Sequence, residues 1–307
     1  MNWCFTQIAA GGWAAVFCLG EVQAGITPIP NGSFESPVTS FVDLNINSWQ
    51  KSPKPDGYVE GGGFLWTQLT GAFKNTPPGR FDHIDNCDGE QAAWLFAVPE
   101  VALFQDYDSV DWDDPAPTHA FDARFEVGKS YKLTVGVIGM GGGMSNGATV
   151  EISLYYRDTE SNMVAAAATT VTNSPNVFSN RTHLIDFEAC VATVKAADPW
   201  AGQHIGLQLL STVSTNLQGG YWAFDNVRLV SFEPPRLLAG GFTDGQFTLT
   251  LQSEPGLSFE ILATNDVTQP PSSWASLGTV TNATGTVAFT DLAANSGQRF
   301  YQARQLP

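Results

Sequence analysis

The sequence has few basic side chains, and few charged ones of either sign. Of its 307 residues, 14 are Lys or Arg and 30 are Asp or Glu, so the formal net charge is -16. No segment clusters Lys and Arg, although a nucleic-acid interface needs such clusters to neutralise phosphates. The composition therefore excludes nucleic acid as a partner.

The sequence also offers no apolar run that looks able to span a membrane. Ile8–Leu19 is apolar but shorter than the roughly 20 residues that a spanning helix needs, and Val22-Gln23-Ala24 follows it as a small-residue cleavage pattern. We predict that residues 1–24 are a secretory signal peptide, with a buried N-terminal strand or helix as the alternative. The mature chain is then expected to be secreted, extracellular or periplasmic, with no membrane span.

Cysteine is scarce, with four residues in the chain. Two of them lie in the predicted signal peptide, which leaves Cys87 and Cys190. An even number of cysteines in an exported chain permits one disulfide, and we predict this pair. The alternative is that both are small buried thiols.

Signs of catalysis are weak. The four histidines are scattered and lack the spacing of a zinc site. Gly143–Gly147 matches the G-x-S-x-G pattern of hydrolases, and Asp186 and His204 follow in the matching order. That pattern needs a strand turning into a helix, whereas this one lies in the glycine-rich run 139–147 between two predicted strands. We predict a hairpin loop there and no catalytic site.

Apolar residues alternate with polar ones along much of the chain, which indicates half-buried strands separated by turns. Helical periodicity is nearly absent. This pattern is typical of an antiparallel sandwich or jelly roll. The clearest predicted strands are 131–137, 149–156, 205–210 and 221–230.

A proline pair marks a predicted domain boundary. Phe232-Glu233-Pro234-Pro235 interrupts the strand pattern, because proline cannot donate to a sheet ladder. We predict a domain over 25–232, a linker over 233–236 and a small β domain over 237–307. The candidate strands of the small domain are 247–251, 258–262, 276–280, 286–289 and 299–304.

Several motifs carry a resemblance to a known family. They are Asn31-Gly32-Ser33-Phe34-Glu35, the segment 88–94 (DGEQAAW), the segment 125–131 (FEVGKSY) and the segment 222–229 (WAFDNVRL). In this order the chain resembles exported galactose-binding-domain-like jelly rolls, whose best-known members are carbohydrate-binding modules. The tail is similar to small β domains appended to bacterial extracellular proteins. The resemblance implies an all-β protein, in which an antiparallel jelly-roll β-sandwich precedes a small immunoglobulin- or fibronectin-like sandwich.

The resemblance also implies a structural calcium ion, held by one acidic residue from the first strand and one from the last. Those residues are Glu35 and Asp225. The alternative is that Asp225 caps a bulge through backbone N–H groups while Glu35 is solvated. The acidic loops 82–90 and 106–114 could compete for calcium, but neither has the spacing of a calcium-binding loop, and we expect solvated loops.

Exposed aromatic rings would provide a binding surface for sugar. The candidates in loop-like context are Trp66, Tyr107, Trp112 and Trp200. We therefore expect a non-catalytic, secreted protein that binds an extracellular glycan, preferably a neutral one because the chain is acidic. The alternatives are a matrix or adhesion protein that contacts other proteins and, in third place, a hydrolase with an unrecognised site.

Overall fold

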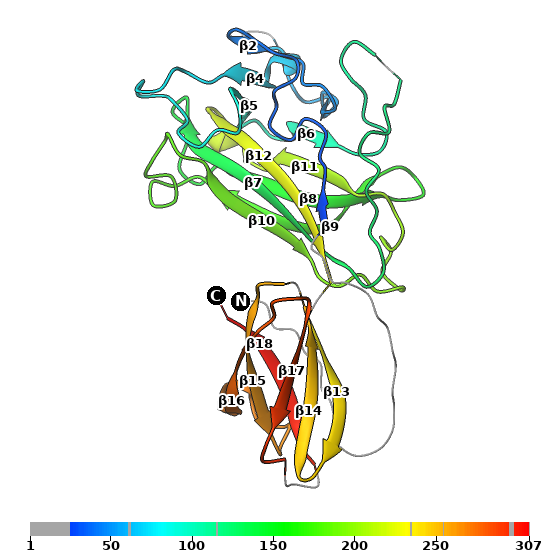
Figure 1. Ribbon diagram of the computed structural model, residues 1–307. Coiled ribbons are helices and arrows are strands. Elements are labelled where there is room, and N and C mark those ends of the chain that lie inside the picture. Colours follow the sequence, from blue (N-terminus) through cyan, green and yellow to red (C-terminus); the bar gives the residue numbers. More distant parts are fainter. Residues whose placement is uncertain are drawn as a thin grey trace. The chain divides into compact units, whose positions relative to one another are not determined.

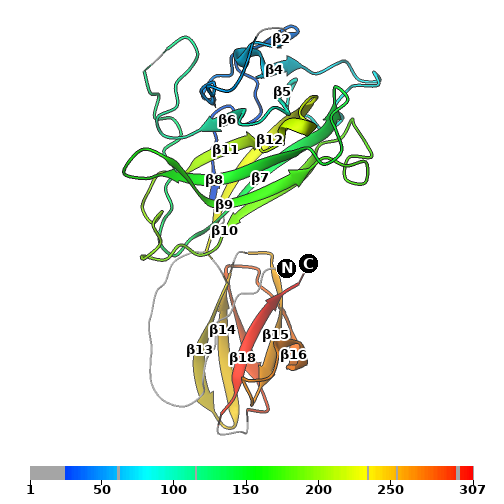
Figure 2. The same cartoon turned by 180° about the vertical axis from the view of Figure 1, so that it is seen from behind.

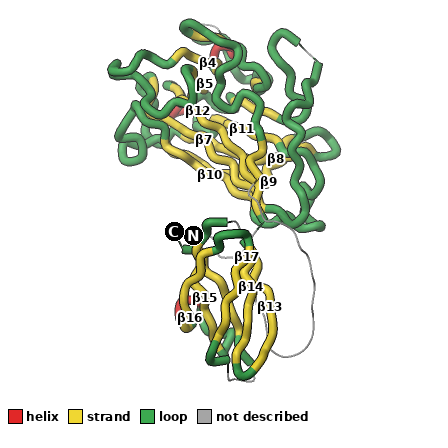
Figure 3. Tube along the Cα trace, in the orientation of Figure 1, coloured by secondary structure: helices red, strands yellow, loops and turns green. Residues whose placement is uncertain are grey.

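The computed structural model describes residues 25–60, 63–114, 116–233, 235–253, 255–294 and 298–306 (Figures 1 and 3). The predicted signal peptide, residues 1–24, lies outside the described residues. The described chain forms two compact units, Ile26–Ser231 and the segment that begins at Phe232.

The first unit consists of two antiparallel sheets (Figures 1 and 2). In spatial order the seven-stranded sheet contains β10 (Ile185–Val191), β7 (Ser130–Gly141), β12 (Tyr221–Phe232), β5 (Gln91–Phe96), β4 (Thr70–Lys74) and β2 (Val42–Asp43), with β1 (Gly25–Thr27) also paired to β12. The five-stranded sheet contains β3 (Gln50–Lys51), β6 (Ala102–Gln105), β11 (Gly206–Ser211), β8 (Thr149–Arg157) and β9 (Met163–Thr172). Two short 3-10 helices, η1 (Trp66–Gln68) and η2 (Thr215–Leu217), lie in the connections.

Alternation along the strands builds the core between these sheets. On β7, Leu133, Val135 and Val137 are fully buried and belong to one apolar cluster. Leu154 on β8 and Leu207 on β11 join the same cluster from the other sheet. Because side chains alternate between the faces of a strand, the intervening residues of β7 lie on the outer face of the seven-stranded sheet.

The glycine-rich run 139–147 connects two strands, but it is not the hairpin that we predicted. β7 and β8 belong to different sheets, so the segment crosses from one sheet to the other. The buried side chain of Asn173 holds this crossing, since it donates to the carbonyls of Met144 and Ser145 and accepts from the N–H of Met140 at 3.0 Å.

The second unit is a small sandwich of two three-stranded antiparallel sheets. One sheet contains β13 (Arg236–Thr243), β14 (Gln246–Gln252) and β17 (Thr286–Asp291); the other contains β16 (Ala275–Thr281), β15 (Ser258–Thr264) and β18 (Phe300–Gln305). A 3-10 helix, η3 (Pro271–Ser273), precedes β16. Leu249, Phe259 and Tyr301 contribute to a core of its own.

The predicted fold class is confirmed: the protein is all-β, with antiparallel sheets throughout. The predicted strands agree with observed strands to within about one residue at their starts. Among the residues that the structure describes, no helix is long and apolar enough to cross a membrane.

Candidate functional site

A cavity of about 540 Å³ lies on the outer face of the seven-stranded sheet, within the size range of small-molecule sites. Its lining is mostly apolar and includes several aromatic rings. The lining residues from the sheet and its edges are Ser40, Phe41, Val42, Phe73, Lys74, Ile138, Gly139, Met140, Gly141, Gly142, Tyr221 and Ala223. Those from the loops are Asn75, Thr76, Pro77, Phe81, Asp82, Ile84 and Arg181.

Strand alternation on β12 places two of these side chains in the cavity. Trp222 and Phe224 are fully buried between the two sheets. Tyr221 and Ala223 therefore lie on the opposite face, where both line the cavity. The small side chain of Ala223 leaves room above the strand, and the larger ring of Tyr221 forms a wall.

Glycines next to Tyr221 allow that ring to lie close to the backbone. A Cβ atom at Gly141 would overlap the carbonyl oxygen and ring of Tyr221. Between glycines, Met140 has a φ of 68°, which is unusual for a residue with a side chain and costs on the order of 1–3 kcal/mol. The glycine-rich run thus shapes one end of the cavity by leaving out side chains.

Two loops cover the far side of the cavity and are fixed to each other. The N–H of Asp85 donates to the carbonyl of Thr182 at 2.7 Å, and the Thr182 hydroxyl donates to the Asp85 carboxylate at 2.8 Å. Ile84 and Leu184 pack together with Ala223 in a small apolar cluster. This packing gives the cavity a fixed wall.

Asp225 lies two residues beyond Ala223, on the same face of β12 but outside the cavity lining. Its side chain is completely buried. One carboxylate oxygen accepts the N–H of Asp88 at 2.6 Å, whereas the other, Oδ1, has no hydrogen-bond partner among the residues that the structure describes. Burial raises the pKa of Asp225 to about 7, and the hydrogen bond from Asp88 opposes part of that rise.

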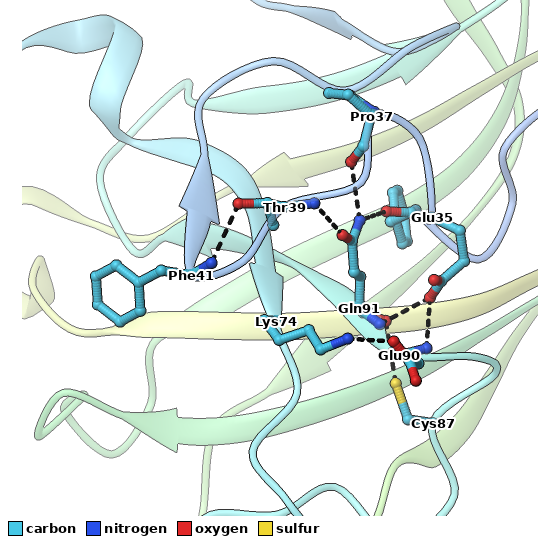
Figure 4. A network of polar contacts seen from close by, with 9 residues as sticks. Glu35, Pro37, Thr39, Phe41, Lys74, Cys87, Glu90 and Gln91 are labelled. Carbon is cyan, nitrogen blue, oxygen red and sulfur yellow. Dashed lines mark hydrogen bonds and ion pairs between the residues drawn. The ribbon is translucent and has the colours of Figure 1, made fainter.

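Glu35 belongs to a polar network that joins the N-terminal segment to the start of β5 (Figure 4), and its charge and that of Asp225 both act on the Cys87 thiol. Its Oε1 atom accepts the N–H groups of Glu90 at 2.8 Å and Gln91 at 2.7 Å. The Gln91 amide donates in turn to the carbonyls of Phe34 and Pro37. Phe41 points away from this network in Figure 4 and belongs to the cavity lining.

The predicted disulfide is wrong, because Cys87 and Cys190 are both free. The Cys87 thiol lies near the carboxylates of Asp225, Glu35 and Asp88, and it donates to the carbonyl of Gln91 at 3.0 Å. Burial, and then the charge of Asp225, raises its pKa. Cys190 is exposed on β10, opposite Lys132 of β7. Cys87 is half-buried and Cys190 is exposed, so the alternative of two buried thiols is wrong as well.

The four aromatic side chains that we selected do not form one surface. Trp66 is buried and donates to the carbonyl of Ser52 at 2.7 Å. Trp200 is half-buried against the core, beside Tyr156. Trp112 is 56% exposed in the acidic loop. None of the four lines the cavity.

Tyr107 is held between two histidine rings. His119 and His204 stack on its two sides, each with ring centroids 4.0 Å from that of Tyr107. His204 also lies 2.9 Å from the Asp122 carboxylate. Both faces of the Tyr107 ring are therefore covered by neighbouring histidine rings.

Sequence reasoning missed the residues that do line the cavity. Phe41, Phe73 and Phe81 come from separate segments, and no local motif links them. One available signal was the glycine-rich run itself, since glycines beside a strand often mark a close backbone approach. Another was Ala223, a small residue on the outward face of a strand.

Comparisons with known proteins identify relatives of the first unit. The family model described as "HpiC1-like: HpiC1 cyclase" matches residues 26–230. A solved cyclase from Fischerella sp. TAU is 21% identical over 69% of this chain and 98% of its own, with a TM-score of 0.50. A second, the Stig cyclase Fisc from the same source in complex with (3Z)-3-(1-methyl-2-pyrrolidinylidene)-3H-indole, is also 21% identical, covers 69% and 99%, and has a TM-score of 0.48.

Carbohydrate-binding domains are among the more distant structural matches. The CBM22-1 xylan-binding domain of Paenibacillus barcinonensis Xyn10C is 10% identical over 63% of this chain and 93% of its own, with a TM-score of 0.33. The family match and the cyclase of TM-score 0.50 support the jelly-roll part of the expected resemblance, but not a specific carbohydrate-binding module. No curated protein matches the chain.

The family match corrects our functional expectations. We expected a non-catalytic protein that binds an extracellular glycan, or else a matrix or adhesion protein. Both expectations are wrong, because the matching model describes cyclases, which are enzymes that act on small molecules. The match spans two thirds of the sequence and all but the last residue of the unit that carries the cavity. The chain belongs to the HpiC1-like cyclase family.

Proposed function

We propose that this protein is a cyclase that closes a ring within a small, apolar, unsaturated molecule held in the cavity on the outer face of the seven-stranded sheet. The observation that carries the proposal is the cavity of about 540 Å³, lined mainly by aromatic and aliphatic side chains, in a chain of a cyclase family. A cavity of this kind favours apolar ligands because they lose little hydration on entering it.

Ring closure requires two ends of one flexible molecule to meet, and a shaped cavity lowers the entropy cost of that meeting. Phe41, Phe73, Phe81 and Tyr221 supply ring surfaces around the cavity. Aromatic faces attract positive charge, so they would stabilise a cationic centre that develops as an unsaturated chain cyclises. The cavity would thus hold the substrate in a folded conformation and stabilise the positive charge that develops.

We also propose calcium as a structural ion at Glu35 and Asp225. Both carboxylates lie near Asp88, and Asp225 Oδ1 is buried without a partner among the described residues, which suits a hard cation as ligand. Among the described residues no three acidic, histidine or cysteine side chains form a ready metal site, so backbone carbonyls or water would complete the coordination. The ion would neutralise buried charge and join the N-terminal segment to β12.

The cavity can be tested by filling it. We expect Ala223→Trp to abolish binding of indole, used as a flat apolar probe and measured by saturation-transfer NMR. Ala165→Trp is the matched control, because Ala165 is exposed on β9 of the other sheet. A folded Ala223→Trp protein that binds indole as well as the control does would contradict the proposed site.

Export remains a proposal that rests on the sequence of residues 1–24. The apolar run and the cleavage pattern at Val22–Ala24 support it. Expression of the full chain in a bacterial host, followed by mass spectrometry of the purified protein, should give an N-terminus at Gly25. A purified protein that still begins at Met1 would contradict the proposal.

A further inference from the structure

Charged side chains are rare in the cavity, and two of them have no ion-pair partner. Lys74, Asp82 and Arg181 are the charged lining residues. Lys74 pairs with Glu90. Among the residues that the structure describes, neither Asp82 nor Arg181 forms an ion pair or a side-chain hydrogen bond.

An unpaired arginine that lines an apolar cavity is notable in this chain, because carboxylates outnumber cations two to one. Five of the eight arginines pair with a carboxylate: Arg124, Arg157, Arg228, Arg299 and Arg304. The other three, Arg80, Arg181 and Arg236, form no ion pair within the described residues, and of these three Arg181 is the one that lines the cavity. A guanidinium in that position can meet an anion that the ligand brings.

The backbone around Arg181 is fixed, so its placement is a property of the fold. The N–H of Thr182 donates to the Asn180 side chain at 2.9 Å. Thr182 is bound to Asp85 of the opposite loop, and the N–H of Leu184 donates to the Asn86 side chain at 2.8 Å. These contacts hold the loops that carry Arg181 and Asp82 against each other.

The geometry points to a ligand with an anionic group. We propose that Arg181 selects substrates that combine an apolar, aromatic body in the cavity with a carboxylate at its edge, and that Asp82 on the neighbouring loop limits their affinity by like-charge repulsion. A carboxylate matches the planar donor fork of arginine, and a bound apolar body would shield the pair from water. This inference rests on the proposed function, since it assigns a substrate class to the same cavity.

The test compares two probes that differ in charge alone. Indole-3-acetate is anionic at pH 7.5, and indole-3-acetamide is its neutral counterpart. We expect the wild-type protein to bind the acetate about tenfold more tightly by isothermal titration calorimetry, as for a hydrogen-bonded charge pair at a partly exposed site. Arg181→Gln should remove that preference, and Asp82→Asn should increase it a few-fold.

Arg80→Gln is the matched control. Arg80 is also exposed and forms no ion pair within the described part of the chain, but it does not line the cavity. Its substitution should leave the preference unchanged. Equal losses in Arg80→Gln and Arg181→Gln would indicate a general charge effect and overturn the inference.

Two further outcomes separate the inference from the function beneath it. Equal affinity of the wild-type protein for both probes, abolished in both cases by Ala223→Trp, would overturn the role of Arg181 and leave the cavity as the binding site. No effect of Ala223→Trp on the binding of either probe would overturn the cavity itself, and the inference with it.

Discussion

The two units of this protein each bury an aspartate on a strand, and the two aspartates have opposite surroundings. In the C-terminal sandwich, Asp291 lies 2.7 Å from the Arg299 guanidinium and accepts the Tyr301 hydroxyl at 3.0 Å. In the jelly roll, Asp225 has acidic neighbours and an oxygen without a partner.

The contrast shows that Asp291 has the partners that a buried carboxylate requires, whereas Asp225 lacks a cationic partner within the described part of the chain. A buried carboxylate is tolerated when a cation and a hydrogen-bond donor satisfy it. The jelly roll can provide such partners, since buried Asp106 pairs there with Arg157 and with the Tyr155 hydroxyl. The isolation of Asp225 is therefore a local property, and the calcium ion proposed above would explain it.

Breaking the Asp291 pair should have the largest effect. Arg299→Met leaves Asp291 buried without its cation, and we expect the C-terminal sandwich to lose about 3–5 kcal/mol of stability. Hydrogen exchange of β14 and β15 would measure the loss. Adding Asp291→Leu should recover much of it; a double variant no more stable than the single one would show that the charge is not the cause.

Removing the Asp225 charge tests whether calcium binds at this carboxylate. At a calcium concentration about a hundredfold above the dissociation constant, the ion would stabilise the wild-type jelly roll by about 2.7 kcal/mol. Asp225→Asn should lose this calcium-dependent gain in melting temperature. In the presence of chelator the variant should be at least as stable as the wild type, because a buried charge is gone. A calcium response that survives in the variant would rule out this site.

The pH dependence without calcium should be next in size. Burial raises the pKa of Asp225 to about 7, above the ordinary value of about 4 in the unfolded chain. Its stabilising contribution is thus complete below about pH 4 and is lost as pH rises through about 7. From pH 5 to pH 8 in chelator, we expect the jelly roll to lose on the order of 2 kcal/mol. Denaturant titrations should show a flatter profile for Asp225→Asn.

Removing one hydrogen bond to Asp291, while its ion pair is kept, should have the smallest effect on stability. Tyr301→Phe removes the hydroxyl that donates to Asp291 but keeps the fully buried ring and the Arg299 ion pair. We expect a loss of about 1 kcal/mol in urea unfolding of the sandwich. A loss as large as that of Arg299→Met would mean that the hydroxyl, rather than the cation, holds the carboxylate.

The all-β architecture was predictable from the sequence because alternation is a local signal. Tyr131–Val137 and Tyr221–Val230 reveal their period within a few residues. β13 was missed, since its residues 240 and 241 are glycines that blur the pattern. The function was mistaken because the jelly-roll motifs identify a scaffold that serves both binding modules and enzymes.

The cavity could not be predicted from the sequence, because its lining depends on which strands and loops become neighbours in the fold. Phe41, Ile138 and Tyr221 are distant in sequence and converge only through strand order. Loop context favoured Trp66 and Trp200, but both pack inward. The disulfide between Cys87 and Cys190 was mispredicted for the same reason, since an even number of thiols does not show whether two of them lie close together.

The dispersed origin of the cavity has a consequence for folding kinetics. Its lining spans positions 40 to 223, so its walls meet only through pairings of high sequence separation, which close late and fold slowly. A chain interrupted before β12 during synthesis has neither Tyr221 nor Ala223 and hence an open cavity. The time at which ligand binding appears during refolding would therefore report when β12, the last strand of the jelly roll, joins the sheet.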